Sequence, residues 1–317
     1  MIKHIPNFAY NFGLYRSDEQ RRINVITEYI QGETLFDYIS GQQFDLNEFL
    51  FILIQVCFAL KVAQNRCGFV HYDLTPWNII LARLQNPVQF DYLISYNEIY
   101  RVNTTVIPVI IDYGKSHVIH NGMHYGLINM FNSSVSQDIF TLLIKSLDVI
   151  LGKRLSPVEF NLIFKLCNFI RPFQNAKEIR SYITKTRKYE ELISLNKHEL
   201  NKDPIDLIQY IVNNNITKPD RPPVWINYEL INDGNYKQIM NTGNPRQVFD
   251  YILSSTTEDR LKSYIDVIQR FRTCTMPQSE NIFFEYYTAQ SFEKGFHSLL
   301  NNLIIFSRVA KINIQKQ

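Results

Sequence analysis

Glycine is scarce in this chain, and its spacing excludes the familiar glycine-rich phosphate loops. Eleven of the 317 residues are glycine, and no two of them have the G-x-G spacing. The sequence therefore contains neither a G-x-G-x-x-G loop nor a G-x-x-x-x-G-K-[ST] loop. Any phosphate-binding site in this chain has to be built differently.

Cysteines and long apolar runs are also few. The four cysteines, Cys57, Cys67, Cys167 and Cys274, have no C-x-x-C spacing, which argues against a disulfide framework or a zinc site and fits a reducing compartment. The longest apolar run, Phe49 to Leu60, is too short to span a bilayer, and the first residues lack the order of a secretion signal. We therefore expect an intracellular protein without a membrane segment.

No excess of one charge sign is present. The 33 basic and 30 acidic side chains leave a net charge of +3, spread along the chain. This balance gives no excess of positive charge of the kind that binds nucleic acid or an anionic membrane, so neither is expected as a partner. With 45% hydrophobic residues, the chain can bury a core, and its length predicts a bilobal domain or two packed domains.

The hydrophobic pattern predicts an α+β fold in which strands come first and helices dominate later. Strands are expected over residues 8–15, 24–29, 78–82, 90–94, 99–103 and 106–111. Helices are expected over residues 33–40, 46–65, 135–151, 157–169, 176–194, 204–213, 245–254, 257–272 and 283–306. The first two strands are expected to form a hairpin, and the helix over 46–65 to be a central core helix.

Two short motifs carry the chemistry. The first is His71-Tyr72-Asp73-Leu74-Thr75-Pro76-Trp77-Asn78, and the second, Ile110-Ile111-Asp112-Tyr113-Gly114, places its Asp 34 positions after Asn78. Asp73, Asn78 and Asp112 supply three oxygen donors that can converge on a hard cation such as Mg2+. Phosphoryl transfer needs this combination, because metal ions neutralise the phosphates while a metal-free carboxylate accepts the proton of the attacking hydroxyl.

These motifs resemble the catalytic loop H-R-D-L-x-x-x-N and the metal-binding D-F-G of protein kinases. The resemblance implies ATP and Mg2+ as cofactors, with Asp73 as the catalytic base and Asn78 and Asp112 as metal ligands. It places His71 and Thr75 in the catalytic loop, Gly114 in the metal-binding motif, and Asp138 as the buried residue that anchors the loop. Upstream, it places Thr27 at the gatekeeper position and offers the backbone of Glu28 to Ile30 to adenine.

In the residues of these motifs and in its high content of Ile and Asn, the chain resembles the divergent protein kinases of large DNA viruses. The implied fold is protein kinase-like, with a mainly α C-lobe and a two-strand remnant of the N-lobe. Residues 1–30 would form the residual strands and hinge, and residues 31–317 the C-lobe, with an insertion at about 85–108. A viral kinase would act in the host cytoplasm or the virion.

Several departures from the kinase pattern keep other functions open. Only 26 residues precede Thr27, which leaves no room for a glycine-rich loop, the phosphate-clamping Lys and its Glu partner. Thr75 replaces the Lys typical of Ser/Thr kinases, Tyr72 replaces the catalytic-loop Arg, and no A-P-E motif is evident. Lys115 follows the second motif and is expected to be an exposed loop residue rather than a phosphate ligand.

The leading hypothesis is a protein kinase-like phosphotransferase acting on Ser or Thr of a protein substrate, possibly with a separate chain supplying the missing lobe. The alternatives are a catalytically inactive pseudokinase or docking module, and a small-molecule kinase. A histidine cluster at His117, His120 and His124 could bind zinc, but without a nearby Cys these are expected to be surface histidines.

Overall fold

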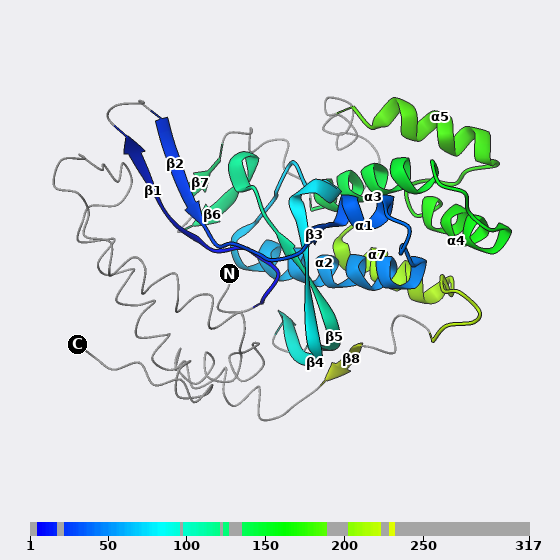
Figure 1. The fold of residues 1–317 in the computed structure, drawn as a ribbon, viewed down its shortest axis with the longest axis horizontal. Helices are drawn as coiled ribbons and strands as arrows, with labels where there is room; N and C mark the ends of the chain where they lie inside the picture. The colour runs from blue at the N-terminus through cyan, green and yellow to red at the C-terminus, as the bar shows by residue number, and fades with distance from the viewer. Residues whose placement is uncertain are drawn as a thin grey trace. The chain divides into compact units, whose positions relative to one another are not determined.

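The computed structural model describes residues 5–17, 22–95, 98–120, 123–126, 135–188, 202–222 and 228–231. These residues fall into two compact units, one that contains the described residues up to Tyr29 and one that begins at Ile30 (Figure 1). In the described residues the fold is mixed, with small antiparallel sheets and a larger number of helical residues. The expected α+β class is confirmed.

The first unit contains one antiparallel hairpin. Strand β1 spans Asn11–Ser17 and β2 spans Arg22–Thr27, with an irregularity in the pairing between Asn11 and Gly13. Just beyond β2, the backbone N–H of Glu28 donates to the carbonyl of Tyr10 at 2.7 Å, and the Glu28 carboxylate accepts the Tyr10 N–H at 3.0 Å. The expected two-strand hairpin is therefore present, while its turn lies outside the described residues.

The second unit is organised around a four-stranded sheet in the order β3-β4-β5-β8. The strands β3 (Glu33–Thr34), β4 (Ile79–Ser95), β5 (Glu98–Ile110) and β8 (Tyr228–Ile231) all pair antiparallel. β4 and β5 form a long hairpin, whose two strands lie side by side in the lower centre of Figure 1. The segment expected as an insertion, about residues 85–108, forms the outer part of this hairpin.

The predicted division of this hairpin into several short strands was wrong. Strands were expected over residues 78–82 and 90–94, but β4 continues between them, past Pro87, through a shift in register between Arg83 and Val88. A bulge of this kind absorbs a proline, because the disrupted pairing needs no N–H at that position. β8 was not predicted at all; it pairs with residues of β5 that lie more than a hundred positions earlier.

The long helix α2, Leu46–Cys67, forms the core of the second unit and packs against β4, β5 and α7. Asp45 caps its start through a bond from the Glu48 N–H, and Gly68 ends it in the left-handed conformation with φ of 55°. Among the described residues it is the one helix long and apolar enough to cross a membrane, yet 89% of its most apolar window is buried inside the protein. This burial is typical of a core helix, as predicted from its almost continuous apolar sequence.

Shorter helices complete the second unit, and most begin at a residue that the sequence marks as a cap. They are α1 (Leu35–Ser40), α3 (Gln137–Ile150), α4 (Pro157–Cys167), α5 (Ala176–Thr186) and α7 (Pro204–Asn213). α1 begins two residues later than predicted, because Glu33 and Thr34 pair with β4 instead. The helices predicted over 245–254, 257–272 and 283–306 lie outside the described residues.

Two further elements border the predicted catalytic motifs. The 3-10 turns η1 (Pro76–Asn78) and η2 (Tyr113–Lys115) hold the ends of the two motifs, and a small hairpin of β6 (Val118–His120) and β7 (Met123–Tyr125) follows the second. The cysteines within the described residues, Cys57, Cys67 and Cys167, are free thiols, as expected from their spacing.

Candidate active site

The loop that carries the first motif is anchored at its start by a short backbone pairing. After Gly68 ends α2, Val70 and His117 exchange two backbone hydrogen bonds of 3.0 and 2.8 Å. This bridge ties the stretch before His71 to the stretch that follows the second motif. The two motifs, 34 positions apart in the sequence, are thereby held side by side.

The side chain of Asp138 holds the backbone at the start of the loop that carries the first motif. Its carboxylate accepts the N–H of His71 at 2.8 Å and the N–H of Tyr72 at 2.9 Å, and its side chain is fully buried. Burial raises the pKa of Asp138, while the nearby His71 and the two backbone bonds oppose the shift. Asp138 therefore anchors the backbone of His71 and Tyr72.

Tyr72 is held in an unusual backbone conformation between these contacts. Its φ is 63°, in the left-handed region that non-glycine residues rarely occupy, and its side chain is fully buried. Such a conformation costs on the order of 1–3 kcal/mol and persists only where the surroundings determine it. Here the Asp138 carboxylate and the buried ring determine it, and the turn directs the next residue, Asp73, out of the core.

His71 joins the two motifs through its ring. Its Nε2 lies 2.9 Å from the carbonyl oxygen of Ile111, and its Nδ1 lies 3.3 Å from the backbone N of Asp73. Because a carbonyl can only accept and an N–H can only donate, Nε2 carries the proton and Nδ1 accepts. The fully buried His71 therefore fixes the backbone just before Asp112 relative to that of Asp73.

Asp73 and Asn78 are joined directly. The Asn78 side-chain N–H donates to the carbonyl of Asp73 at 2.8 Å, and the Thr75 N–H donates to the same oxygen at 2.8 Å. The backbone carbonyl of Asn78 in turn accepts the Ile111 N–H at 3.0 Å. With its amide nitrogen turned toward Asp73, Asn78 directs Oδ1 away from that carbonyl and keeps it available as an oxygen ligand.

Asp112 follows Ile111 at the end of β5 and is exposed. It adopts the left-handed conformation, with φ of 59° and ψ of 72°, and its Oδ1 accepts the Gly114 N–H at 3.4 Å. A side-chain Cβ at Gly114 would lie 3.3 Å from that same oxygen, so glycine keeps this approach open. Hydrogen bonds thus link Asp73 and Asn78 to Ile111, the residue before Asp112.

The oxygen donors of this site fit Mg2+ better than a softer metal. An amide oxygen from Asn78 and a carboxylate from Asp112 are hard ligands, and Mg2+ is commonly held by one or two carboxylates together with substrate phosphates. No group of three or more His, Cys, Asp or Glu side chains in the described part of the chain could hold a metal ion by itself. A cation at Asn78 and Asp112 would therefore share its coordination with phosphate oxygens and water.

Lys115 is a site residue that the sequence reasoning missed. Its side chain is exposed, as expected, but its Nζ lies 2.9 Å from Oδ2 of Asp73. The contact joins the residue after the second motif to the predicted base in the first. Its position directly after Asp-Tyr-Gly was the available signal, and the expected exposure of Lys115 is accompanied by a contact that was not predicted.

A stacked aromatic pair joins α1 to η1. Trp77, in η1, is 45% exposed, and its ring stacks on Phe36 of α1 with centroids 4.4 Å apart. Neither residue was predicted as part of the site. The stack ties α1 to the turn that carries Asn78.

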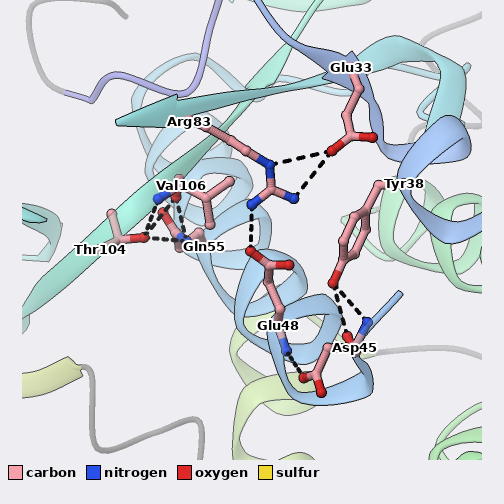
Figure 2. A network of polar contacts seen from close by, with 8 residues as sticks. All are labelled: Glu33, Tyr38, Asp45, Glu48, Gln55, Arg83, Thr104 and Val106. Atoms are coloured by element: carbon pink, nitrogen blue, oxygen red, sulfur yellow. Dashed lines mark hydrogen bonds and ion pairs between the residues drawn. The ribbon is translucent and has the colours of Figure 1, made fainter. Parts of the chain in front are cut away.

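A polar network holds α1 and β3 in place relative to α2 (Figure 2). Arg83 of β4 contacts Glu33 at 3.2 Å and Glu48 at 2.8 Å, bridging β3 and α2. The Tyr38 hydroxyl accepts the Asp45 N–H at 3.0 Å and donates to the Asp45 carbonyl at 3.2 Å, and burial raises its pKa. The network also supports η1 indirectly, because α1 packs on η1.

A second group of buried polar side chains in Figure 2 joins α2 to β5. The Gln55 side-chain N–H donates to the carbonyl of Val106 at 3.1 Å and approaches the Thr104 hydroxyl at 3.4 Å. Gln55 is fully buried in the middle of the core helix. These bonds fix the core helix against the strand that ends at Asp112.

The histidine cluster is only partly as expected. His117 is buried, not a surface residue, because its backbone pairs with Val70, and its Nε2 lies 3.0 Å from Nδ1 of His124. Burial, and then the neighbouring His124, lower the pKa of His117. The side chain of His120 lies outside the described part.

The residues proposed to contact adenine belong to different units. Thr27 pairs with Asn11 in the first hairpin, and the N–H of Glu28 is engaged by Tyr10. Ile30 belongs to the second unit and is buried. The assignment of these three residues to nucleotide binding stays a prediction.

The comparisons with known proteins agree with the kinase resemblance at a coarse level. The chain is 32% identical over 352 residues to "Uncharacterized protein 179R" of Invertebrate iridescent virus 6, an alignment covering 98% of this chain and 29% of the relative. It is 31% identical to "Probable kinase 098L" of Invertebrate iridescent virus 3, over 67% of this chain and 39% of the relative. A stretch covering 22% of the chain is 33% identical to "Serine/threonine-protein kinase A" of Synechocystis sp., covering 14% of that protein.

No family model matches the chain. The chain spans about 30% of the length of the first viral relatives it matches. The viral matches fit a viral origin, and the two kinase-named relatives indicate a kinase-like relationship over part of the chain.

Proposed function

We propose that this chain is a protein kinase-like phosphotransferase that moves the γ-phosphate of ATP to a Ser or Thr hydroxyl of a protein. The proposal is carried by one observation: Asp73, Asn78 and the residue before Asp112 are tied together by direct hydrogen bonds, with His71 between them and Asp138 beneath. Phosphoryl transfer depends mainly on positioning, and these bonds fix the backbone that carries the oxygen donors of Asp73, Asn78 and Asp112. The kinase-named relatives support the reaction class.

In this mechanism Asp73 is the base. Its partly exposed carboxylate can accept the proton of an acceptor hydroxyl, while the bonds to its backbone from Asn78 and Thr75 keep the loop rigid. Asn78 and Asp112 would hold Mg2+, which when bound neutralises charge on the phosphates of ATP. His71 and Asp138 act by positioning these groups and do not touch the substrate.

Part of the phosphate cradle is proposed to come from elsewhere. Asn78 and Asp112 would stabilise only some of the phosphate oxygens, and the sequence of this chain contains no glycine-rich loop. We propose that a separate polypeptide segment or partner chain supplies this loop and its lysine. ATP-Mg2+ should accordingly bind weakly to this chain alone, and more tightly when such a lobe is added.

The test combines nucleotide binding with phosphate transfer. Thermal-shift titration with ATP-Mg2+ and transfer of labelled phosphate to a generic protein acceptor are measured for the wild type and for Asp73→Asn, with and without an added glycine-rich lobe. We expect Asp73→Asn to keep nucleotide binding and to abolish transfer, because Asp73 acts on the hydroxyl and not on the nucleotide. Asp148→Asn is the matched control, since Asp148 on α3 is a partly exposed carboxylate that pairs with Arg187.

Three results would redirect the proposal. Transfer that survives Asp73→Asn rejects Asp73 as the base. Absence of nucleotide binding even with the added lobe favours the inactive docking module. Transfer to small hydroxylated molecules in preference to proteins favours the small-molecule kinase, for which the replacement of the catalytic-loop Lys by Thr75 is the motivating feature.

A further inference from the structure

The small hairpin of β6 and β7 is joined to the stretch before His71 by an isolated backbone bridge. His117, just before β6, donates its N–H to the Val70 carbonyl at 2.8 Å and accepts the Val70 N–H at 3.0 Å. β6 and β7 otherwise pair with each other as a two-stranded sheet. A hairpin of this size has little stability by itself, so its position depends on the contacts at its base.

The side chain of His117 makes the second contact at this base. Its Nε2 lies 3.0 Å from Nδ1 of His124 in β7, and the planes of the two rings differ by 22°. His117 is 2% exposed, whereas His124 is exposed to water. Nδ1 of His117 is buried and has no hydrogen-bond partner within the described residues. The ring of His117 thus has a partner at one nitrogen only.

Counting the ring protons shows which charge state this contact accepts. A neutral pair carries two ring protons, one shared in the contact and one on an outer nitrogen. Because Nδ1 of His117 has no acceptor, the outer proton belongs on Nε2 of the exposed His124, and His117 donates from Nε2. A third proton would have to go to Nδ1 of His117. A buried N–H without an acceptor is unfavourable, so the pair takes up a proton only when the rings separate.

The surrounding elements offer no counter-ion for a protonated pair. In the part of the chain that the structure describes, His124 is the one titratable group recorded to act on His117, and no carboxylate is recorded in contact with either ring. The last turn of α2, which packs near β6, carries Arg66 and Cys67, and neither has a recorded contact with these rings. The ring of His71 bonds to the backbone of the two motifs instead.

We propose that the contact between His117 and His124 is an acid-sensitive latch, which holds the β6–β7 hairpin against the stretch before the candidate active site and opens when the pair is protonated. Above a pH of about 6.5 the rings are neutral and the latch is closed. Burial, and then His124, lower the pKa of His117, so the closed form is stabilised above the ordinary pKa and loses this stabilisation as the pH falls below it. Val70 directly precedes His71, so opening frees the start of the catalytic loop. An effect on phosphate transfer rests on the proposed function, whereas the latch itself does not.

The test measures how firmly the hairpin is held at two pH values. Hydrogen exchange of the His117 N–H, which donates to the Val70 carbonyl, is followed on the full chain and divided by the intrinsic rate at each pH. Between pH values of about 7.5 and 5.5, the protection of this N–H should fall at least about ten-fold in the wild type. The reason is that an open form whose rings have the ordinary pKa of about 6.5 gains about ten-fold for each ring at one pH unit below that value.

Variants at position 124 separate the shared proton from a general effect of charge. Glutamine accepts a hydrogen bond but does not titrate, so His124→Gln should keep the protection at neutral pH and show a smaller fall in acid. Arginine can only donate, which forces the proton of His117 onto its buried Nδ1, so His124→Arg should lose about ten-fold already at neutral pH. Tyr125→Arg is the control, because it adds the same charge at the next residue of β7 and should stay within about two-fold of the wild type.

Several results would overturn the latch. Protection that is independent of pH in the wild type does so, as does a His124→Arg variant that is protected like the wild type at neutral pH. Equal losses in His124→Arg and Tyr125→Arg assign the effect to added charge and not to the ring contact. Nitrogen NMR of the wild-type rings is a second measurement that needs no variant: a protonated Nδ1 of His117 at neutral pH contradicts the proton count. None of these measurements uses a nucleotide, so their failure leaves the proposed function untouched, and a chain without transfer activity leaves the latch untouched.

Discussion

The carboxylate of Asp138 accepts the backbone N–H of Tyr72 at 2.9 Å and so holds a non-glycine residue at a φ of 63°. The two residues are 66 positions apart in the sequence. The same carboxylate also accepts the N–H of His71, so one buried side chain fixes two consecutive peptide groups next to the predicted base.

Asp138→Ala should destabilise the protein by about 2–4 kcal/mol. The change leaves two buried backbone donors without their acceptor, each at a cost of about 1–3 kcal/mol, and releases the strained turn. Urea unfolding followed by circular dichroism measures the effect. As a control, Asp148→Ala on α3, the helix that also carries Asp138, removes a partly exposed ion pair with Arg187. It should lower the free energy of unfolding by less than about 1 kcal/mol. Equal losses for the two variants would contradict an anchoring role for Asp138.

Asp112→Asn should fold nearly as well as the wild type but lose the stabilisation by ATP-Mg2+. Asparagine tolerates the left-handed backbone at φ of 59°, whereas Asp112→Ala should cost about 1–2 kcal/mol because alanine does not. Asn215→Ala is the control, since Asn215 also has a positive φ of 49°. It should lose a similar stability and keep the thermal shift with ATP-Mg2+. A normal thermal shift for Asp112→Asn would reject Asp112 as a metal ligand.

Stability should fall in acid partly because Glu159 loses its charge. A hydrogen bond from Lys218 at 2.8 Å, and then the bond from the Ser156 backbone, lower the pKa of Glu159 from 4.5 to about 2. A depressed folded-state pKa stabilises the protein above the unfolded value, and this contribution is lost as the pH falls from about 5 toward 2. Lys218→Met should lower stability at pH 7 and flatten the decline in urea-unfolding measurements at each pH. If the free energy of unfolding falls with pH as steeply in Lys218→Met as in the wild type, the loss of stability in acid comes from other carboxylates.

Mild acid should also destabilise the contact between His117 and His124. Because burial and His124 lower the pKa of His117, the folded state favours the neutral ring, and its stabilising contribution is present above the unfolded pKa of about 6.5 and lost below it. Hydrogen exchange of the Val70 N–H, which bonds to the carbonyl of His117, reports on this region. Exchange should accelerate, relative to the intrinsic rate, between about pH 6.5 and 5.5 in the wild type. His117→Asn should remove that dependence.

Local sequence signals accounted for most of the helices. α7 begins at Pro204 and ends at Asn213 as predicted, because an aspartate cap and a proline mark its start. α2 extends only two residues beyond the predicted end, to the position before Gly68. These boundaries depend on caps and on bonds between residues a few positions apart, so neighbouring residues suffice to predict them.

The candidate site was predictable as a set of residue types but not as a set of contacts. The two motifs supplied Asp73, Asn78 and Asp112, and the kinase resemblance added Asp138 downstream of them. Lys115 and the stacked Phe36 and Trp77 were missed, because a sequence pattern shows that a lysine or tryptophan is present but not which side chain it meets.

The sequence by itself determined the order of the helices within the described residues, the class of the fold and the residues proposed to carry the chemistry. Only the tertiary structure decided that β4 continues through Pro87, that β8 joins β5, that His117 is buried, and that Lys115 contacts the predicted base. Strand pairing and side-chain contacts join residues tens to more than a hundred positions apart, and the partner of each depends on how the whole unit packs. Helices close their own backbone bonds within four residues, which is why the sequence reveals them first.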